Sequence, residues 1–229
     1  MKDLCSVPEF YDLYVFDLDG TLIDSLSDLA DSVNLMLLHF RLPEVGLQDV
    51  KKAIGSGARN LISQCLSLSL QSLHERERVI QNASIDIDEC LSYYRETYRA
   101  RCLCKTKPYP KMLKTLRDLE SAGKIMTVLT NKPTEAARSI LDGLALSGCF
   151  QIIAGPEYAG VLKPDPSGIG KILNECGISG DRAIMVGDSA VDILTGKAAM
   201  ISTCGIIGGL GDHEDMISSV PDYVVDLDT

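Results

Sequence analysis

The sequence predicts an α/β fold: a Rossmann-like, doubly wound parallel sheet with an all-helical domain inserted into it. Three observations predict this class. Short, nearly continuous apolar runs recur along the chain, as expected of parallel strands that are covered on both faces. Helical patterns alternate with these runs over most of the sequence. One block of about 80 residues has helical patterns and no convincing strand.

Six strands are expected from the apolar runs. The first, "DLYVFD", ends at an acid near the N-terminus, and the second, "IMTVLT", ends at a threonine. Runs this short are typical of strands rather than of helices. The expected ranges are 12–17, 125–130, 150–153, 183–187, 201–207 and 222–225.

Helices are expected between these strands. The segment "PKMLKTLRDLESAG" begins with Pro110 and ends at Gly123, which matches the preference for proline at helix starts and glycine at helix ends. Segments 133–144 and 166–177 show the same pattern, and a further helix is expected at 189–199.

The helical block interrupts the alternation directly after the first strand. Its first helix keeps Leu29, Val33 and Leu37 on one face, with Ser25 and Asp28 as a capping box. We therefore expect a core of residues 1–23 and 105–229 and a helical domain of residues 24–104. The helices expected in this domain are 25–40, 47–54, 58–70, 73–81 and 86–101.

Composition narrows the classes of partner. A formal net charge of −10 disfavours nucleic acids and anionic membranes, because binding to phosphates by counterion release needs clustered Lys and Arg. The sequence has neither a long apolar run nor an N-terminal signal-peptide pattern, so a cytoplasmic protein is expected. The eight cysteines show no CxxC spacing and are expected to be reduced.

Polar groups follow four of the expected strands. They are Asp17 with Asp19, Thr130 with Asn131, Lys163, and the segment "GDSAVD". An open parallel sheet binds its ligands at the carboxyl ends of its strands, so these groups should meet. Acids, a hydroxyl, an amide and an ammonium suit a hard cation such as Mg²⁺ together with a phosphate group. A carboxylate such as that of Asp17 can then attack phosphorus.

The motifs "DLDGT", "TN", "KP" and "GDSAVD" resemble, in this order, the four motifs of the haloacid dehalogenase superfamily of hydrolases. The resemblance covers essentially the whole chain, including the insertion point of a helical cap domain. "TNKP", "KPDP" and the cap segment "IGSGARNLI" look most like the phosphoglycolate phosphatase branch.

The resemblance implies roles for four acids and a Mg²⁺ cofactor. Asp17 would be the nucleophile and would also bind the metal. Asp19 would act as general acid and then as general base, and its backbone carbonyl would bind the metal. Asp188 would be a metal ligand, directly or through water. Asp192 would orient Lys163 or a metal-bound water.

The remaining implied roles concern the phosphoryl group and the substrate. Thr130 and Asn131 would bind the transferring phosphoryl group, and Lys163 would neutralise its charge. Gly55 and Gly57 are either plain loop glycines or part of a cap loop that selects the substrate. Arg59 either binds a substrate carboxylate, as phosphoglycolate would require, or forms a surface ion pair. The partner would be a small phosphorylated metabolite, and the protein a monomer or homodimer.

Other members of the superfamily remain as alternatives. The dehalogenase branch lacks the second acid, which Asp19 supplies here, and the β-phosphoglucomutase branch carries a histidine early in its cap that this sequence lacks. A Mg²⁺-dependent phosphatase acting on a phosphoglycolate-like ester is therefore favoured. A pyrophosphatase or a broad sugar-phosphate phosphatase stays open as an alternative. A β-phosphoglucomutase-like mutase and, on the same fold, a non-catalytic binding protein are less favoured alternatives.

Overall fold

The computed structural model describes residues 10–75 and 85–227. The chain divides into two compact units. One comprises Met1–Asp24 and Lys107–Thr229, and the other comprises Ser25–Thr106. These divisions lie close to the positions where the sequence predicts its two domains to meet, and each unit is described below by itself.

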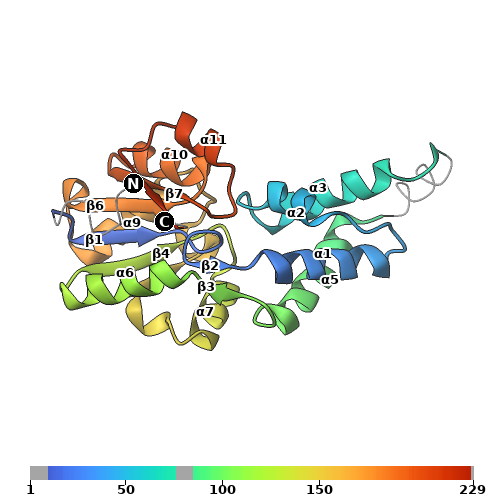
Figure 1. The fold of residues 1–229 in the computed structure, drawn as a ribbon, viewed down its shortest axis with the longest axis horizontal. Coiled ribbons are helices and arrows are strands. Elements are labelled where there is room, and N and C mark those ends of the chain that lie inside the picture. Colours follow the sequence, from blue (N-terminus) through green and yellow to red (C-terminus); the bar gives the residue numbers. More distant parts are fainter. Residues whose placement is uncertain (1–9, 76–84, 228–229) are drawn as a thin grey trace. The chain divides into compact units, whose positions relative to one another are not determined.

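The first unit is built on a six-stranded parallel sheet with the order β5-β4-β1-β6-β7-β8 (Figure 1). All six expected strands are present, with ends that differ by one or two residues, and the predicted α/β class is confirmed. The strands are β1 (Leu13–Phe16), β4 (Ile125–Leu129), β5 (Ile152–Ala154), β6 (Ala183–Gly187), β7 (Ser202–Ile207) and β8 (Tyr223–Asp226).

Strand β1 lies in the middle of the sheet, between β4 and β6. All four of its residues are buried, which explains why the strand is apolar throughout rather than alternating. Leu13 and Val15 belong to a core cluster that includes Ile169 and Ile172. Tyr14 and Phe16 point to the opposite face of the strand. A strand buried in this way is a rigid support for the residues that follow it.

Helices cover both faces of this sheet. Figure 1 shows α6 and α7 on one side and α10 and α11 on the other. Helices α8 and α11 are not predicted by the sequence, because so few residues cannot display a helical period. The helices are α6 (Pro110–Ser121), α7 (Thr134–Gly143), α8 (Pro156–Ala159), α9 (Ser167–Cys176), α10 (Ala190–Ala198) and α11 (His213–Ser218), with 3₁₀ turns at Ser147–Cys149 and Gly180–Arg182.

The described secondary structure of the second unit is helical, and loops connect the helices. The helix expected over 73–81 falls, from residue 76 on, outside the described residues. In neither unit does the described part of the chain contain a helix with the length and apolarity needed to span a bilayer. The helices of this unit are α1 (Leu26–His39), α2 (Leu47–Ala53), α3 (Ala58–Gln71) and α5 (Ile87–Arg101).

The capping box expected at the start of α1 is wrong. Ser25 is the N-cap residue, but its side chain makes no capping hydrogen bond. The buried carboxylate of Asp28 instead accepts hydrogen bonds from the backbone N–H groups of Lys105 and Thr106 and from the Thr106 hydroxyl, at 2.8 to 3.1 Å. These distant donors outcompete the local one, and Asp28 thereby ties the end of the unit to its beginning.

A short antiparallel pair joins the two passages of the chain between the units. Strand β2 (Ile23–Asp24) pairs with β3 (Lys107–Pro108), so that Ile23 lies opposite Pro108 and Asp24 opposite Lys107. The sequence does not predict this pair, because two residues carry no readable alternation. It places the point where the chain leaves the first unit beside the point where it returns.

Candidate active site

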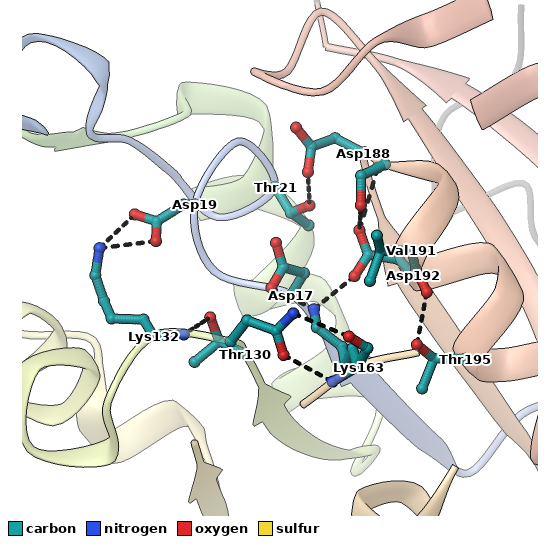
Figure 2. Close-up of polar contacts among 12 residues, drawn as sticks. Asp17, Asp19, Thr21, Thr130, Lys132, Lys163, Asp188, Val191, Asp192 and Thr195 are labelled. Atoms are coloured by element: carbon teal, nitrogen blue, oxygen red, sulfur yellow. Dashed lines mark hydrogen bonds and ion pairs between the residues drawn. The ribbon is translucent and has the colours of Figure 1, made fainter. Parts of the chain in front are cut away.

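The candidate site lies at the carboxyl edge of the parallel sheet (Figure 2). Asp17 directly follows β1, Thr130 directly follows β4, and Asp188 directly follows β6. Because these three strands are neighbours and run in the same direction, their ends bring the three side chains to one place.

The loop after β1 is a tight turn held by its own backbone. The N–H groups of Leu22 and Ile23 both donate to the Leu18 carbonyl, and the Gly20 N–H donates to the Ile23 carbonyl at 2.8 Å. Gly20 has a φ of +88°, a conformation that favours glycine. A Cβ at this position would also overlap the Asp188 carboxylate. The turn and the approach of Asp188 therefore both depend on a glycine.

Lys163 links two of the acids. Its ammonium donates to Asp17 Oδ1 at 2.6 Å and to Asp192 Oδ1 at 2.5 Å. The side chains of Lys163 and Asp192 are only 4% and 1% exposed, and that of Asp17 is 12% exposed. Such buried charges persist only when they are paired. The structure therefore unites three residues that lie far apart in the sequence.

The electrostatics of this group are dominated by burial. Burial raises the pKa of Asp17 to about 8, and the charges of Asp192 and Asp188 add to the rise, whereas Lys163 opposes it. Burial also opposes the charge on Lys163, but the carboxylates of Asp17 and Asp192 outweigh it and raise the pKa of the ammonium. Lys163 therefore stays protonated, whereas burial and the neighbouring carboxylates disfavour a negative charge on Asp17.

Asp188 is held by groups that the sequence analysis did not identify. Its Oδ1 accepts from the Thr21 hydroxyl at 3.1 Å, and its Oδ2 accepts from the N–H groups of Leu210 and Gly211, both at 2.7 Å. Burial and the charge of Asp192 raise its pKa to about 6, although these hydrogen bonds oppose the rise. Thr21 belongs to the "DLDGT" motif and could have been identified from it.

Asp192 also fixes the helix that begins beside Asp188. Its Oδ2 accepts from the Ser189 N–H at 3.1 Å and from the Ser189 hydroxyl at 2.6 Å. This reciprocal arrangement is a capping box at the start of α10. One buried carboxylate therefore orients both Lys163 and the helix.

Asn131 positions the backbone that carries Lys163. Its Oδ1 accepts from the Lys163 N–H at 2.7 Å, and its Nδ2 donates to the Lys163 carbonyl at 3.2 Å. The Thr130 hydroxyl accepts from the Lys132 N–H at 3.2 Å. The two residues therefore hold the backbone of Lys132 and of Lys163, and the phosphate contacts expected of them stay a prediction.

Asp19 contacts a lysine, Lys132, that the sequence analysis did not include among the site residues. The Lys132 ammonium contacts Asp19 Oδ1 at 2.9 Å and Oδ2 at 2.7 Å. Lys132 directly follows the "TN" motif, and its position after a strand end was the signal that could have identified it.

Comparison with known proteins decides the family. The family model of haloacid dehalogenase-like hydrolases matches residues 14–206, which is most of the chain. The chain is a haloacid dehalogenase-like hydrolase. The matched segment contains every site residue discussed above except Leu210 and Gly211.

Several proteins similar to this hydrolase are named phosphoglycolate phosphatases. It is 33% identical over 93% of its length to phosphoglycolate phosphatase 1 of Pseudomonas aeruginosa, of which the match covers 76%. It is 34% identical to the phosphoglycolate phosphatase of Aquifex aeolicus, with 92% and 90% of the two chains covered. A crystal structure of a predicted phosphoglycolate phosphatase from Haemophilus somnus superimposes with a TM-score of 0.84 at 28% identity, covering 93% of each chain. The predicted family and phosphoglycolate phosphatase-like branch are confirmed.

The donor set of this hydrolase fits a divalent cation. Carboxylate oxygens of Asp17, Asp188 and Asp192 lie within 4.8 Å of one another. Lys163 compensates one of the three negative charges, and burial, together with the charges of the neighbouring carboxylates, raises the pKa values of Asp17 and Asp188. A hard cation with oxygen ligands, such as Mg²⁺, would supply the missing charge. Both oxygens of Asp188 and both oxygens of Asp192 already accept hydrogen bonds, so these bonds do not decide which of the two acids is the better ligand.

The three expected residues of the helical domain lie in the second unit of this hydrolase. Gly55 and Gly57 have φ values of +109° and +85°, and Gly57 is the N-cap residue of α3. Arg59 forms an ion pair with Asp88, and both side chains are largely exposed. Their part in binding the substrate stays a prediction.

Proposed function

We propose that the protein is a Mg²⁺-dependent phosphatase that hydrolyses a small, phosphoglycolate-like phosphomonoester through an aspartyl-phosphate on Asp17. The observation that carries the proposal is the buried contact of Asp17 with Lys163, inside a cluster that also contains Asp188 and Asp192. This contact supports the proposal of one site that combines a nucleophile, a cation for the phosphoryl group and a donor set for Mg²⁺.

In the first step, a carboxylate oxygen of Asp17 attacks phosphorus and the bond from phosphorus to the alcohol oxygen breaks. Asp19 donates a proton to the leaving oxygen. Lys163 neutralises charge on the phosphoryl oxygens, and Thr130 and Asn131 hold them. Mg²⁺, bound by Asp17, Asp188 and the Asp19 carbonyl, would supply further charge stabilisation.

In the second step, water attacks the phosphorus of the aspartyl-phosphate. Asp19, now a carboxylate, accepts a proton from this water. The bond between phosphorus and the Asp17 oxygen breaks, which releases inorganic phosphate and restores both acids. Asp192 keeps Lys163 in place through both steps.

Specificity is assigned to the second unit, acting as a cap. Similarity to proteins named phosphoglycolate phosphatases supports, for this protein, a substrate with a carboxylate near its phosphate. Arg59 is the proposed partner of that carboxylate, with the loop of Gly55 and Gly57 beside it. Arg59 would then exchange Asp88 for the substrate carboxylate.

The proposal is tested by measuring phosphate release from a panel of phosphomonoesters and pyrophosphate, with Mg²⁺ or EDTA. We expect Mg²⁺-dependent release led by phosphoglycolate and its loss in Asp17→Asn, with the fold retained by circular dichroism. Asp118→Asn, the same substitution at an exposed pair on α6, serves as the control and should keep full activity.

The outcomes separate the alternatives. Activity led by pyrophosphate or sugar phosphates would keep the mechanism and replace the substrate. Near wild-type turnover in Asp17→Asn would exclude Asp17 as nucleophile. No release from any compound would contradict the proposed function.

Arg59 has its own test. Arg59→Ala should raise KM for phosphoglycolate by roughly ten-fold or more, the value of a charged hydrogen bond, and change KM for uncharged esters little. Steady-state kinetics on a carboxylated and an uncharged ester would check this. An equal rise for both would remove the proposed contact.

A further inference from the structure

Lys132 is a buried cation for which the proposed mechanism has no role. It lies at the end of β4, two residues after Thr130, and contacts both carboxylate oxygens of Asp19. The side chains of Lys132 and Asp19 are only 6% and 14% exposed. Burying a lysine in this way costs free energy, because the side chain loses conformational entropy and its ammonium loses hydration. The pair therefore differs from an ordinary ion pair on the protein surface.

The backbone of Asp19 is fixed without Lys132. The N–H groups of Leu22 and Ile23 donate to the Leu18 carbonyl at 2.9 and 3.1 Å, and Gly20 closes the turn on Ile23. The Cα of Asp19 therefore has little freedom. The direction of its carboxylate is the remaining variable, and the contact with Lys132 sets it.

The two acids of the loop have separate cations. Asp17 contacts Lys163 at 2.6 Å, and Asp19 contacts Lys132 at 2.7 Å. Figure 2 shows the two carboxylates directed at their own lysines rather than at each other. Without Lys132, two carboxylates on one loop would compete for Lys163 and for any bound cation, since an unpaired buried charge is unfavourable.

We propose that Lys132 is a positioning residue that fixes the direction of the Asp19 carboxylate and keeps it apart from the nucleophile Asp17. This inference rests on the proposed function, because it takes Asp19 as the group that donates a proton to the leaving alcohol. Lys132 acts through Asp19 and needs no contact with the substrate.

A double-mutant cycle tests the proposal. Wild type, Lys132→Met, Asp19→Asn and the double variant are compared with Mg²⁺ on an alkyl phosphate and on p-nitrophenyl phosphate, whose leaving group needs no proton. Lys132→Met should lower kcat for the alkyl ester by about 100-fold, the lower range for general acid catalysis, with little change in KM. The loss on the aryl ester should be smaller.

The same cycle distinguishes a positioning role from a direct one. In the Asp19→Asn background, Lys132→Met should cost almost nothing more, because residues that act as a unit are not additive. Lys132→Arg should restore most of the lost rate. Independent losses that multiply, or a raised KM with unchanged kcat, would overturn the proposal. Lys114→Met, at an exposed pair on α6, is the matched control.

Urea unfolding of the same four proteins gives a readout without turnover. The loss in the double variant should be smaller than the sum of the two single losses. Additive losses would show that the pair does not form and would overturn the proposal. If the wild type releases no phosphate, the proposed function fails and the catalytic part of this inference fails with it, while a non-additive unfolding cycle still identifies the pair.

Discussion

At the scale of single residues, Gly20 connects the loop of the two acids with the rest of the site. Its positive φ closes the turn, and its missing side chain leaves the space occupied by the Asp188 carboxylate. Asp188 in turn depends on Thr21 and on the N–H groups of Leu210 and Gly211. A change at Gly20 should therefore act on Asp188 before it acts on Asp17.

Gly20→Ala should lose most activity and at least about 1 kcal/mol of stability, because alanine is strained at this φ and its Cβ displaces Asp188. Phosphate release and urea unfolding would check both effects. Gly123→Ala is the control, since it also has a positive φ but has open space at its Cβ position. Equal loss of activity in both variants would contradict the role of Asp188.

The sequence predicts the positions of the acids but not their partners. Asp17 and Asp188 directly follow apolar strands, and the topology of a parallel sheet is enough to bring them together. Lys163 comes after α8, and its backbone is held by Asn131. The contact of Lys132 with Asp19 and the contacts of Leu210 and Gly211 with Asp188 depend on how the loops fold. No periodic pattern encodes such contacts, so they had to come from the structure.

At the scale of elements, Asp28 shows how a long-range contact overrides a local signal. The spacing of Ser25 and Asp28 matches a capping box, yet Asp28 receives three hydrogen bonds from Lys105 and Thr106. Strands were predictable because burial on both faces makes them apolar, whereas β2, β3, α8 and α11 are too short to show a period. Local rules thus succeed where an element is long or fully buried.

Asp28→Ala should destabilise the second unit by roughly 3 kcal/mol, because the buried donors of Thr106 and the partly buried N–H of Lys105 lose their acceptor. Asp86→Ala removes only the exposed N-cap contact of α5 and should cost about 1 kcal/mol. Urea unfolding of the two variants measures the difference. Similar losses would show that the Asp28 contacts are no stronger than an ordinary cap.

At the scale of the whole molecule, each unit carries a buried thiol that reports on it. Cys65 lies in the second unit and Cys204 in the first, and both are buried and free. Burial raises the pKa of each to about 12, and the charge of Asp49 adds to the rise for Cys65. The thiolate is the reactive form, so raised pKa values slow labelling near neutral pH.

Near about pH 8, where an ordinary thiol is partly ionised, a thiol reagent should label Cys104, the exposed cysteine, before the other cysteines of residues 10–75 and 85–227. Cys65 and Cys204 should stay unreacted. Raising the pH should speed their labelling, because more thiolate forms as the pH approaches the raised pKa. In urea, Cys65 should become reactive at a lower concentration than Cys204, because a smaller unit buries a smaller share of its surface. Mass spectrometry of labelled peptides would follow each site, and coincident midpoints would show that the units unfold together.

The β2–β3 pair means that the helical unit is a single insertion. Asp24 and Lys107 lie opposite each other, and everything between them leaves and returns through this one pair. Joining these two residues with a two-residue turn such as Asn-Gly would complete an ordinary β-hairpin and leave the register of the parallel sheet unchanged. Helical inserts of other sizes can be exchanged at the same junction for the same reason. The architecture is therefore modular: the reacting groups stay on a constant scaffold, and the part assigned to substrate choice can be replaced without rebuilding it.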